Sequence, residues 1–273
     1  AVAGAERVFE ILDEAPEPPD KEGALCLASP HGEIEFRHVG FGYDPQKSVL
    51  RDISVRIPAG TQVAIVGATG SGKTTVINLL TRFYDVSSGS ILLDGHDLRD
   101  YRMEDLRKAF GVVLQDTALF AASIRENISY GHPEAGMEEV LRAAEIAGAD
   151  SFIARLPEGY DTVLELGGME LSQGERQLLT IARAVLADAP ILILDEATSS
   201  VDTVTEQKIR RAMLKMCENR TSVIIAHRLS TIRNSDLILL LENVEIAERG
   251  THEELMALDG NYAGMYRTQT KIG

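Results

Sequence analysis

The sequence lacks several features that would each point to a particular class of protein. It has no tryptophan and only two cysteines, and basic residues are outnumbered, since 27 Lys and Arg face 42 Asp and Glu for a net charge of −15. Cys26 and Cys217 lie far apart in no metal-ligand spacing, so we expect free thiols of a reducing compartment. The acidic balance argues against non-specific binding to nucleic acid or to an anionic membrane, because both are polyanions.

Long apolar runs are also missing. The longest, at 191–194 and 237–241, have the length of strands and fall well short of the roughly 18 residues that a membrane-spanning helix needs. Residues 1–10 have neither the basic start nor the apolar core of a signal peptide. The composition, 44% hydrophobic over 273 residues, is that of an acidic globular protein with one large domain or two small ones. These features are typical of a cytoplasmic protein.

The first 20 residues divide into two parts. Residues 1–12 predict a short helix with no obvious core of its own, and residues 13–20 are acidic and carry three prolines, which is the composition of a linker. A helix followed by a linker is typical of a fragment of a longer chain, and a frayed terminus is the alternative.

From residue 33 onward, strand patterns alternate with helix patterns. The strands are expected at 33–38, 52–57, 61–66, 90–93, 112–114, 191–194, 222–226 and 236–241. The helices are expected at 74–83, 137–148, 172–186, 205–217 and 251–258. Continuous apolar strands alternating with helices indicate a parallel sheet with helices on both faces. The mostly helical block between about 117 and 186 is interpreted as an insertion.

Residues 67–74 read G-A-T-G-S-G-K-T and fit the phosphate-loop pattern G-x-x-x-x-G-K-[ST] in full. The segment also follows a predicted strand and precedes a predicted helix. Glycines let the backbone wrap around a polyphosphate, and the helix N-terminus adds its dipole. Lys73 would reach the β- and γ-phosphates, and the Thr74 hydroxyl would bind Mg²⁺. The dinucleotide pattern G-x-G-x-x-G is absent from this segment, which therefore predicts a nucleoside triphosphate site.

Two carboxylates follow the apolar strand 191–194, where ligands of α/β sheets bind. Asp195 would hold Mg²⁺ through water. Glu196, which points in a different direction, would polarise the attacking water.

The segment 171–175, L-S-Q-G-E, opens a predicted helix upstream of these carboxylates. It resembles the LSGGQ signature of ATP-binding cassette (ABC) ATPases, and the resemblance covers about residues 33–265. A serine at a helix start beside a flexible glycine can bind a phosphate. In this family that phosphate is the γ-phosphate held by the partner subunit, so the resemblance assigns Ser172 and Gly174 to a neighbouring site. Residues 6–13 look like the junction behind the last membrane helix of the exporter branch, which favours the fragment interpretation.

The resemblance implies further roles. Tyr43 would stack on adenine, Gln115 would touch Mg²⁺ and the attacking water, and His227 would contact the γ-phosphate and Glu196. Asp202 belongs to a segment similar to the D-loop, which crosses the dimer interface. The implied catalytic residues are Glu196, His227, Gln115 and Lys73, and the implied metal ligands are Thr74, Gln115 and Asp195. The implied nucleotide-binding residues are Tyr43, Gly67, Thr69, Gly70, Ser71, Gly72, Lys73, Thr74, Thr75, Ser172, Gly174 and Asp202.

The implied fold is α/β, a RecA-like P-loop NTPase core with an N-terminal antiparallel β subdomain and an inserted helical subdomain. Residues 1–20 would be the helix stump and linker of a membrane domain, and 21–273 the cassette. The core and β subdomain would occupy about 33–116 and 187–273, and the helical subdomain about 117–186.

The implied function is that of the motor domain of an ABC exporter, which hydrolyses ATP with Mg²⁺ at the cytoplasmic face of the cell membrane. Its expected partners are a second nucleotide-binding domain, identical or homologous, and the transmembrane domain of the same transporter. Nucleic acid is not an expected partner.

The sequence departs from the family pattern at four places. Glu175 ends the signature where glutamine is usual, and it brings negative charge near a triphosphate unless it points away. Gln173 replaces a glycine, and Glu165-Leu166 stands for the usual Gly-Glu pair ahead of the signature. Val244 replaces a hairpin glycine before a late strand, which affects stability more than chemistry.

Two other function classes remain as alternatives. An ABC ATPase acting on nucleic acid would carry coiled coils or cysteine modules between the P-loop and the signature, and this sequence shows neither heptads nor cysteine clusters there. A cassette that binds ATP without hydrolysing it is disfavoured by Glu196 and His227. Glu175 keeps this second alternative open for the partner's site.

Overall fold

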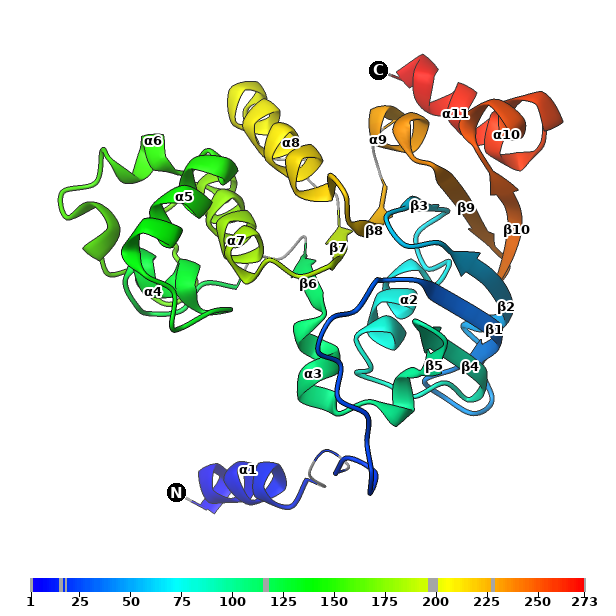
Figure 1. Cartoon of the computed structure of the whole chain (residues 1–273), viewed down its shortest axis with the longest axis horizontal. Helices are drawn as coiled ribbons and strands as arrows, with labels where there is room; N and C mark the ends of the chain where they lie inside the picture. Colours follow the sequence, from blue (N-terminus) through cyan, green and yellow to red (C-terminus); the bar gives the residue numbers. More distant parts are fainter. Residues whose placement is uncertain are drawn as a thin grey trace.

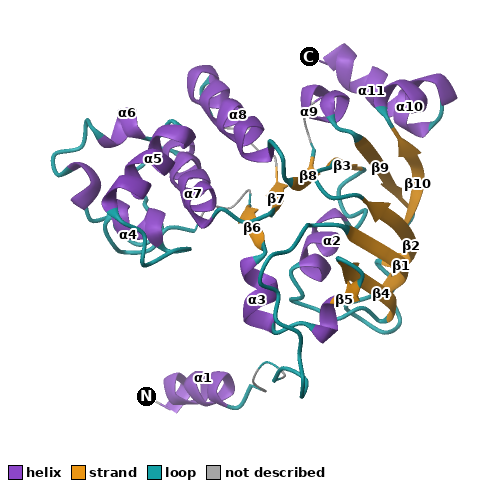
Figure 2. Ribbon diagram, viewed as in Figure 1, coloured by secondary structure: helices purple, strands orange, loops and turns teal. Residues whose placement is uncertain are grey.

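The computed structural model describes residues 2–14, 17, 19–114, 118–195, 201–226 and 229–272. Two β-sheets and the helices next to them form one lobe, and a cluster of helices forms a second lobe beside it (Figure 1). Coloured by type, the strands all belong to the first lobe (Figure 2). Within the described residues, no helix combines the length and apolar character needed to cross a bilayer.

A six-stranded sheet forms the centre of the first lobe, in the order β10-β9-β3-β8-β7-β6. Its members are β3 (Gln62–Val66), β6 (Phe110–Val113), β7 (Ile191–Asp195), β8 (Thr221–Ile225), β9 (Leu237–Glu242) and β10 (Glu245–Gly250). All pairs are parallel except β9 with β10. The apolar runs of β3, β7 and β8 are almost wholly buried, because both faces of the sheet pack against other elements of the chain. The expected parallel sheet is confirmed.

A second, antiparallel sheet has the order β2-β1-β4-β5. It contains β1 (Ile34–Phe41), β2 (Leu50–Ile57), β4 (Ser88–Leu93) and β5 (His96–Asp97). Its apolar face shares one core with β3 and with α2 (Lys73–Leu80). The antiparallel β subdomain expected from the sequence is therefore present, and it packs against the helix that follows the glycine loop.

Helices make up most of the rest of the described chain. α4 (Ile124–Ser129), α5 (Met137–Ala147), α6 (Asp150–Ile153) and α7 (Gln173–Ala187) share a buried core and form the second lobe (Figure 1). α8 (Thr203–Cys217) contacts α7 and α5. α9 (Leu229–Asn234), α10 (His252–Leu258) and α11 (Asn261–Ile272) lie near the end of the chain, and α3 (Met103–Lys108) precedes β6.

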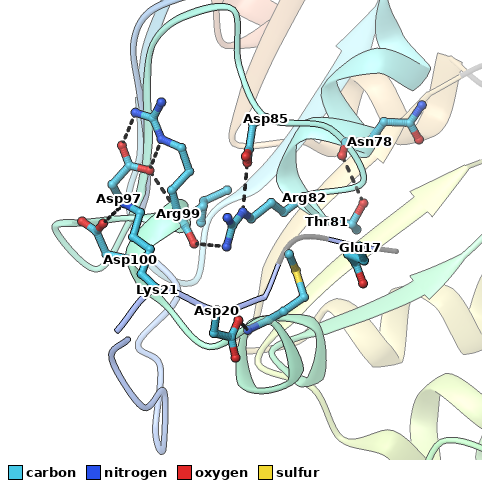
Figure 3. A network of polar contacts seen from close by, with 12 residues as sticks. Glu17, Asp20, Lys21, Asn78, Thr81, Arg82, Asp85, Asp97, Arg99 and Asp100 are labelled. Carbon is cyan, nitrogen blue, oxygen red and sulfur yellow. Dashed lines mark hydrogen bonds and ion pairs between the residues drawn. The ribbon is translucent and has the colours of Figure 1, made fainter. Parts of the chain in front are cut away.

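The segment between α1 (Val2–Leu12) and β1 is bound along α3 and the short helix η1 (Leu98–Asp100). The Asp20 carboxylate accepts a hydrogen bond from the backbone N–H of Met103, 2.9 Å away, at the first residue of α3. Lys21 pairs with Asp100 at 2.6 Å, as Figure 3 shows. The predicted linker is thus attached to the first lobe by its charged side chains.

Candidate nucleotide-binding site

The loop between β3 and α2 has a backbone that only glycine fits well. Gly67 and Gly72 have φ angles of 149° and 100°, a region that other residues rarely adopt. A Cβ at Gly67 would collide with the Leu241 carbonyl, and one at Gly72 would lie 2.8 Å from the Leu50 side chain. The loop is therefore held tightly between β9 and β2.

Lys73 turns its side chain back into this loop. Its Nζ donates hydrogen bonds to the carbonyls of Gly67 at 2.9 Å and Ala68 at 2.8 Å. Burial lowers the pKa of the Lys73 ammonium, while the negative charge of Asp195 acts in the opposite direction. Because the loss of hydration dominates, the ammonium would gain from a further anion such as a phosphate.

A second polar group of the loop lacks a hydrogen-bond partner among the described residues. The Ser71 hydroxyl is buried, and within the described chain it has no hydrogen-bond partner. The hydroxyl lies next to Gly67 on the inside of the loop. A buried hydroxyl normally has a partner, so an unpartnered one in the same loop as the Lys73 ammonium fits a loop that holds an anion. These residues fit a nucleoside triphosphate.

The residues present also fit Mg²⁺. Thr74 is exposed in the first turn of α2, and Asp195 ends β7 in the same sheet as β3. Among the described residues, no group of three or more His, Cys, Asp and Glu side chains could hold a metal ion. Mg²⁺ commonly takes only one or two protein ligands together with substrate phosphates, so Thr74 and Asp195 would be enough to hold it beside a bound nucleotide.

The motif residues follow strands that end at one edge of the sheet. β3, β6, β7 and β8 run parallel, with Asp195 beside Ile225 and Ile225 beside Ile65. Ligands of such sheets bind beyond the carboxyl ends of the strands. The predicted catalytic residues Gln115, Glu196 and His227 lie outside the described residues, just after β6, β7 and β8. Their roles remain predictions from the sequence.

Tyr43, the predicted adenine-stacking residue, is brought to α2. The residue is 51% exposed, and its hydroxyl lies 3.3 Å from the Thr75 hydroxyl. The side-chain amide of Asn78 donates a hydrogen bond of 3.0 Å to the same Tyr43 hydroxyl. The sequence interpretation missed Asn78, although a position three residues after Thr75 lies on the same face of a helix.

The signature segment lies away from this loop, at the start of α7 in the helical lobe (Figure 1). The Ser172 side chain caps α7, and the Glu175 side chain turns back to accept from the Ser172 backbone. A Cβ at Gly174 would lie 2.5 Å from the Thr205 methyl group, so this glycine also lets α7 approach α8 closely. The structure therefore does not bring Ser172 to the Lys73 loop of the same chain.

Asp202 has a local structural role. Its carboxylate caps α8 by accepting hydrogen bonds from the backbone N–H groups of Val204 at 3.1 Å and Thr205 at 3.0 Å. These hydrogen bonds lower the pKa of Asp202, because they favour the charged carboxylate. The cap fixes the start of α8, so Asp202 joins the segment that resembles the D-loop to this helix.

Comparison with known proteins identifies the family to which the chain belongs. A model of the family described as "ABC transporter" matches residues 50–199. The chain is 53% identical over 269 residues to an uncharacterized ABC transporter ATP-binding protein, YfiC, of Bacillus subtilis. It is 49% identical over 270 residues to an ATP-dependent lipid A-core flippase of Syntrophus aciditrophicus. These matches cover 98–99% of this chain but only 44–45% of the relatives, so the chain spans less than half of their length.

A solved structure agrees with the sequence relatives. A bacterial Atm1-family ABC exporter with ATP bound superposes with a TM-score of 0.89 at 43% sequence identity, over 98% of this chain and 47% of that one. The chain therefore belongs to the ABC transporter family, and its fold is that of the family's ATPase domain.

Proposed function

We propose that the chain is the ATP-hydrolysing motor domain of an ABC exporter. The observation that carries this proposal is the glycine loop between β3 and α2, where the buried Lys73 ammonium turns back onto the carbonyls of Gly67 and Ala68. Exporter function is favoured by the similarity to an Atm1-family exporter and to a lipid A-core flippase.

In the proposed reaction, a water attacks the γ-phosphorus in line with the leaving ADP oxygen. Lys73 and the loop N–H groups hold the β- and γ-phosphates and stabilise the charge that develops on them. When bound at Thr74 and Asp195, Mg²⁺ supplies positive charge that offsets that of the phosphates. Glu196 positions the attacking water. Gln115 contacts this water, and His227 contacts the γ-phosphate and Glu196.

The proposed active unit is a head-to-tail pair of such domains. Ser172 and Gly174 sit in a different lobe from Lys73 (Figure 1), so they would complete the site of a partner rather than their own. That partner is a second ABC nucleotide-binding domain, either identical or homologous, and Asp202 would lie near the contact between the two.

A second proposed partner is the transmembrane domain of the same transporter, at the cytoplasmic face of the cell membrane. The end of α1 supports this partner, because Phe9 is 60% and Ile11 is 74% exposed there. Apolar side chains on one short helix normally pack against another element. Residues 1–20 would then form the connection, and 21–273 the cassette, with the helical subdomain at about 117–186.

The dependence of ATP hydrolysis on protein concentration tests this proposal. We expect the phosphate release per molecule to rise with concentration, because two domains must meet to form a complete site, and Lys73→Ala to abolish it. A rate per molecule that does not change with concentration would contradict the two-domain site. Activity that survives in Lys73→Ala would contradict the loop's role.

A further inference from the structure

Tyr43 is attached to the phosphate-loop helix through its hydroxyl group. We propose that Asn78 is a positioning residue that holds the Tyr43 ring ready to receive the adenine of ATP, and so links the base to the phosphate loop. This inference rests on the proposed function, in which Tyr43 stacks on adenine. Asn78 itself is not proposed to touch the nucleotide.

The hydrogen bonds around the Tyr43 hydroxyl have a defined direction. The Asn78 amide nitrogen can only donate, so the phenolic oxygen accepts at 3.0 Å. The phenolic proton remains free to be donated to the Thr75 hydroxyl, 3.3 Å away. Both partners lie on α2, which begins at Lys73. The hydroxyl therefore has its donor and its acceptor function satisfied by one helix.

Two neighbouring rings restrict Tyr43 further. Phe41 and Tyr84 each lie 5.0 Å from the Tyr43 ring, at interplanar angles of 85° and 87°. Edge contacts of this kind favour one ring orientation. Yet half of the Tyr43 surface stays exposed, so the ring is oriented while it remains accessible to a ligand.

These contacts fix the distance between the Tyr43 ring and the phosphate loop before a nucleotide binds. The loop that ends at Gly72 and the helix that holds Tyr43 are continuous in sequence, so the ring and the phosphate cradle move together. A tyrosine without the Asn78 hydrogen bond would have to be ordered when the nucleotide binds, and ordering a side chain weakens binding. The hydrogen bond between Asn78 and Tyr43 therefore affects the binding only of ligands that carry a base.

Two ligands separate this role from a structural one. ATP carries a base and inorganic tripolyphosphate does not, so binding of both is measured by calorimetry for Tyr43→Phe, Asn78→Ala and the double variant. We expect each single change to weaken ATP about threefold to tenfold, which corresponds to one hydrogen bond. Tripolyphosphate affinity should not change. The double variant should lose no more than Tyr43→Phe alone, because removal of the hydroxyl already removes its hydrogen bond to Asn78.

Tyr130→Phe is the matched control, since Tyr130 is a partly exposed tyrosine of the helical lobe, and it should bind ATP like the wild type. Additive losses in the double variant, or an equal loss for tripolyphosphate, would overturn the role of Asn78.

Tyr43→Ala distinguishes the stacking role of Tyr43 from the positioning role of Asn78. If it binds ATP normally, the proposed stacking fails as well. If it binds ATP weakly while Asn78→Ala and Tyr43→Phe bind normally, only the positioning role fails.

Discussion

The hydroxyl of Ser172 donates a hydrogen bond to the carboxylate of Glu175, 2.8 Å away, in the first turn of α7. The same carboxylate oxygen accepts the backbone N–H of Ser172 at 3.0 Å. The glutamate that departs from the family signature thus turns back onto the signature serine instead of pointing away. In the proposed dimer, a γ-phosphate has to compete with this carboxylate for the serine proton.

Glu175→Gln should therefore strengthen ATP-dependent dimerisation. Glutamine keeps the geometry of the capping box but removes a negative charge near the incoming triphosphate. We expect the ATP concentration that half-saturates dimer formation to fall about threefold to tenfold. Light scattering across an ATP titration measures this concentration.

The chain contains a matched control for that change. Ser123 and Glu126 form the same capping box at the start of α4, with the hydroxyl 2.7 Å from the carboxylate. Glu126→Gln should alter the stability of its helix as Glu175→Gln does, and leave dimerisation as it is. Equal effects of the two variants on dimerisation would contradict a special role of Glu175.

The β9–β10 hairpin contains a backbone conformation that its residue does not favour. Asn243 and Val244 have φ angles of 49° and 68°, as a two-residue hairpin turn requires. Valine is β-branched, and the left-handed region costs such a residue roughly 1 to 2 kcal/mol. Val244→Gly should therefore stabilise the protein by about 1 kcal/mol against unfolding in urea.

The backbone contact at this turn should survive the change, because Val244 contributes its carbonyl oxygen to Arg51 N–H, at 2.7 Å. Asn243→Gly should have a smaller effect, since asparagine tolerates this conformation. A lower urea midpoint for Val244→Gly than for the wild type would contradict this prediction. The valine side chain would then stabilise the fold by more than its left-handed backbone conformation destabilises it.

Much of the fold could be predicted because apolar periodicity reports burial directly. β7 is a run of apolar residues and was expected at 191–194, and α7 was expected at 172–186 from its apolar spacing. β1 was expected to end at residue 38 but continues to Phe41. Its register shifts after Phe36, where His38 has a φ of 49°, so the alternation on which the prediction depends is interrupted.

Other elements lack the apolar periodicity that would predict them from the sequence. β10 (Glu245–Gly250) carries charged residues and is only partly buried, and its strand geometry comes from pairing with β9 at the edge of the sheet. β10 was expected only through the family resemblance, as the strand after the hairpin at Val244, and α3 and α11 were missed. The Tyr43–Asn78 hydrogen bond joins residues 35 positions apart, and the link between Asp20 and Met103 spans 83. Contacts between distant segments depend on how the elements pack, which periodicity does not report.

The lowered pKa of Lys73 predicts how nucleotide binding depends on pH. Burial disfavours the protonated amine of Lys73, whereas bound phosphates favour it, so nucleotide binding raises that pKa again. Affinity should be highest below the lowered pKa and should decrease as the pH rises through it. The ATP affinity is measured by calorimetric titration between about pH 8 and about pH 10, a range that ends just below the ordinary pKa of lysine.

Lys108→Met provides the comparison for this pH profile. Lys108 is an exposed lysine whose pKa is raised by the Glu104 carboxylate, so removing it should leave the decrease in ATP affinity unchanged. Lys73→Met should bind ATP weakly across the whole range, without that decrease. An affinity that stays constant in the wild type would contradict the assignment of Lys73.

The proposal that ATP is hydrolysed between two copies of this domain, or between it and a homologue, is tested most directly with Glu196→Gln. This change keeps the size of the side chain but removes the carboxylate that is proposed to position the water. The measurement is the molar mass of the variant in solution with and without ATP, together with phosphate release. We predict a monomer without ATP, a stable dimer with ATP and no turnover. Phosphate release at the wild-type rate, or a variant that stays monomeric with ATP, would contradict the account.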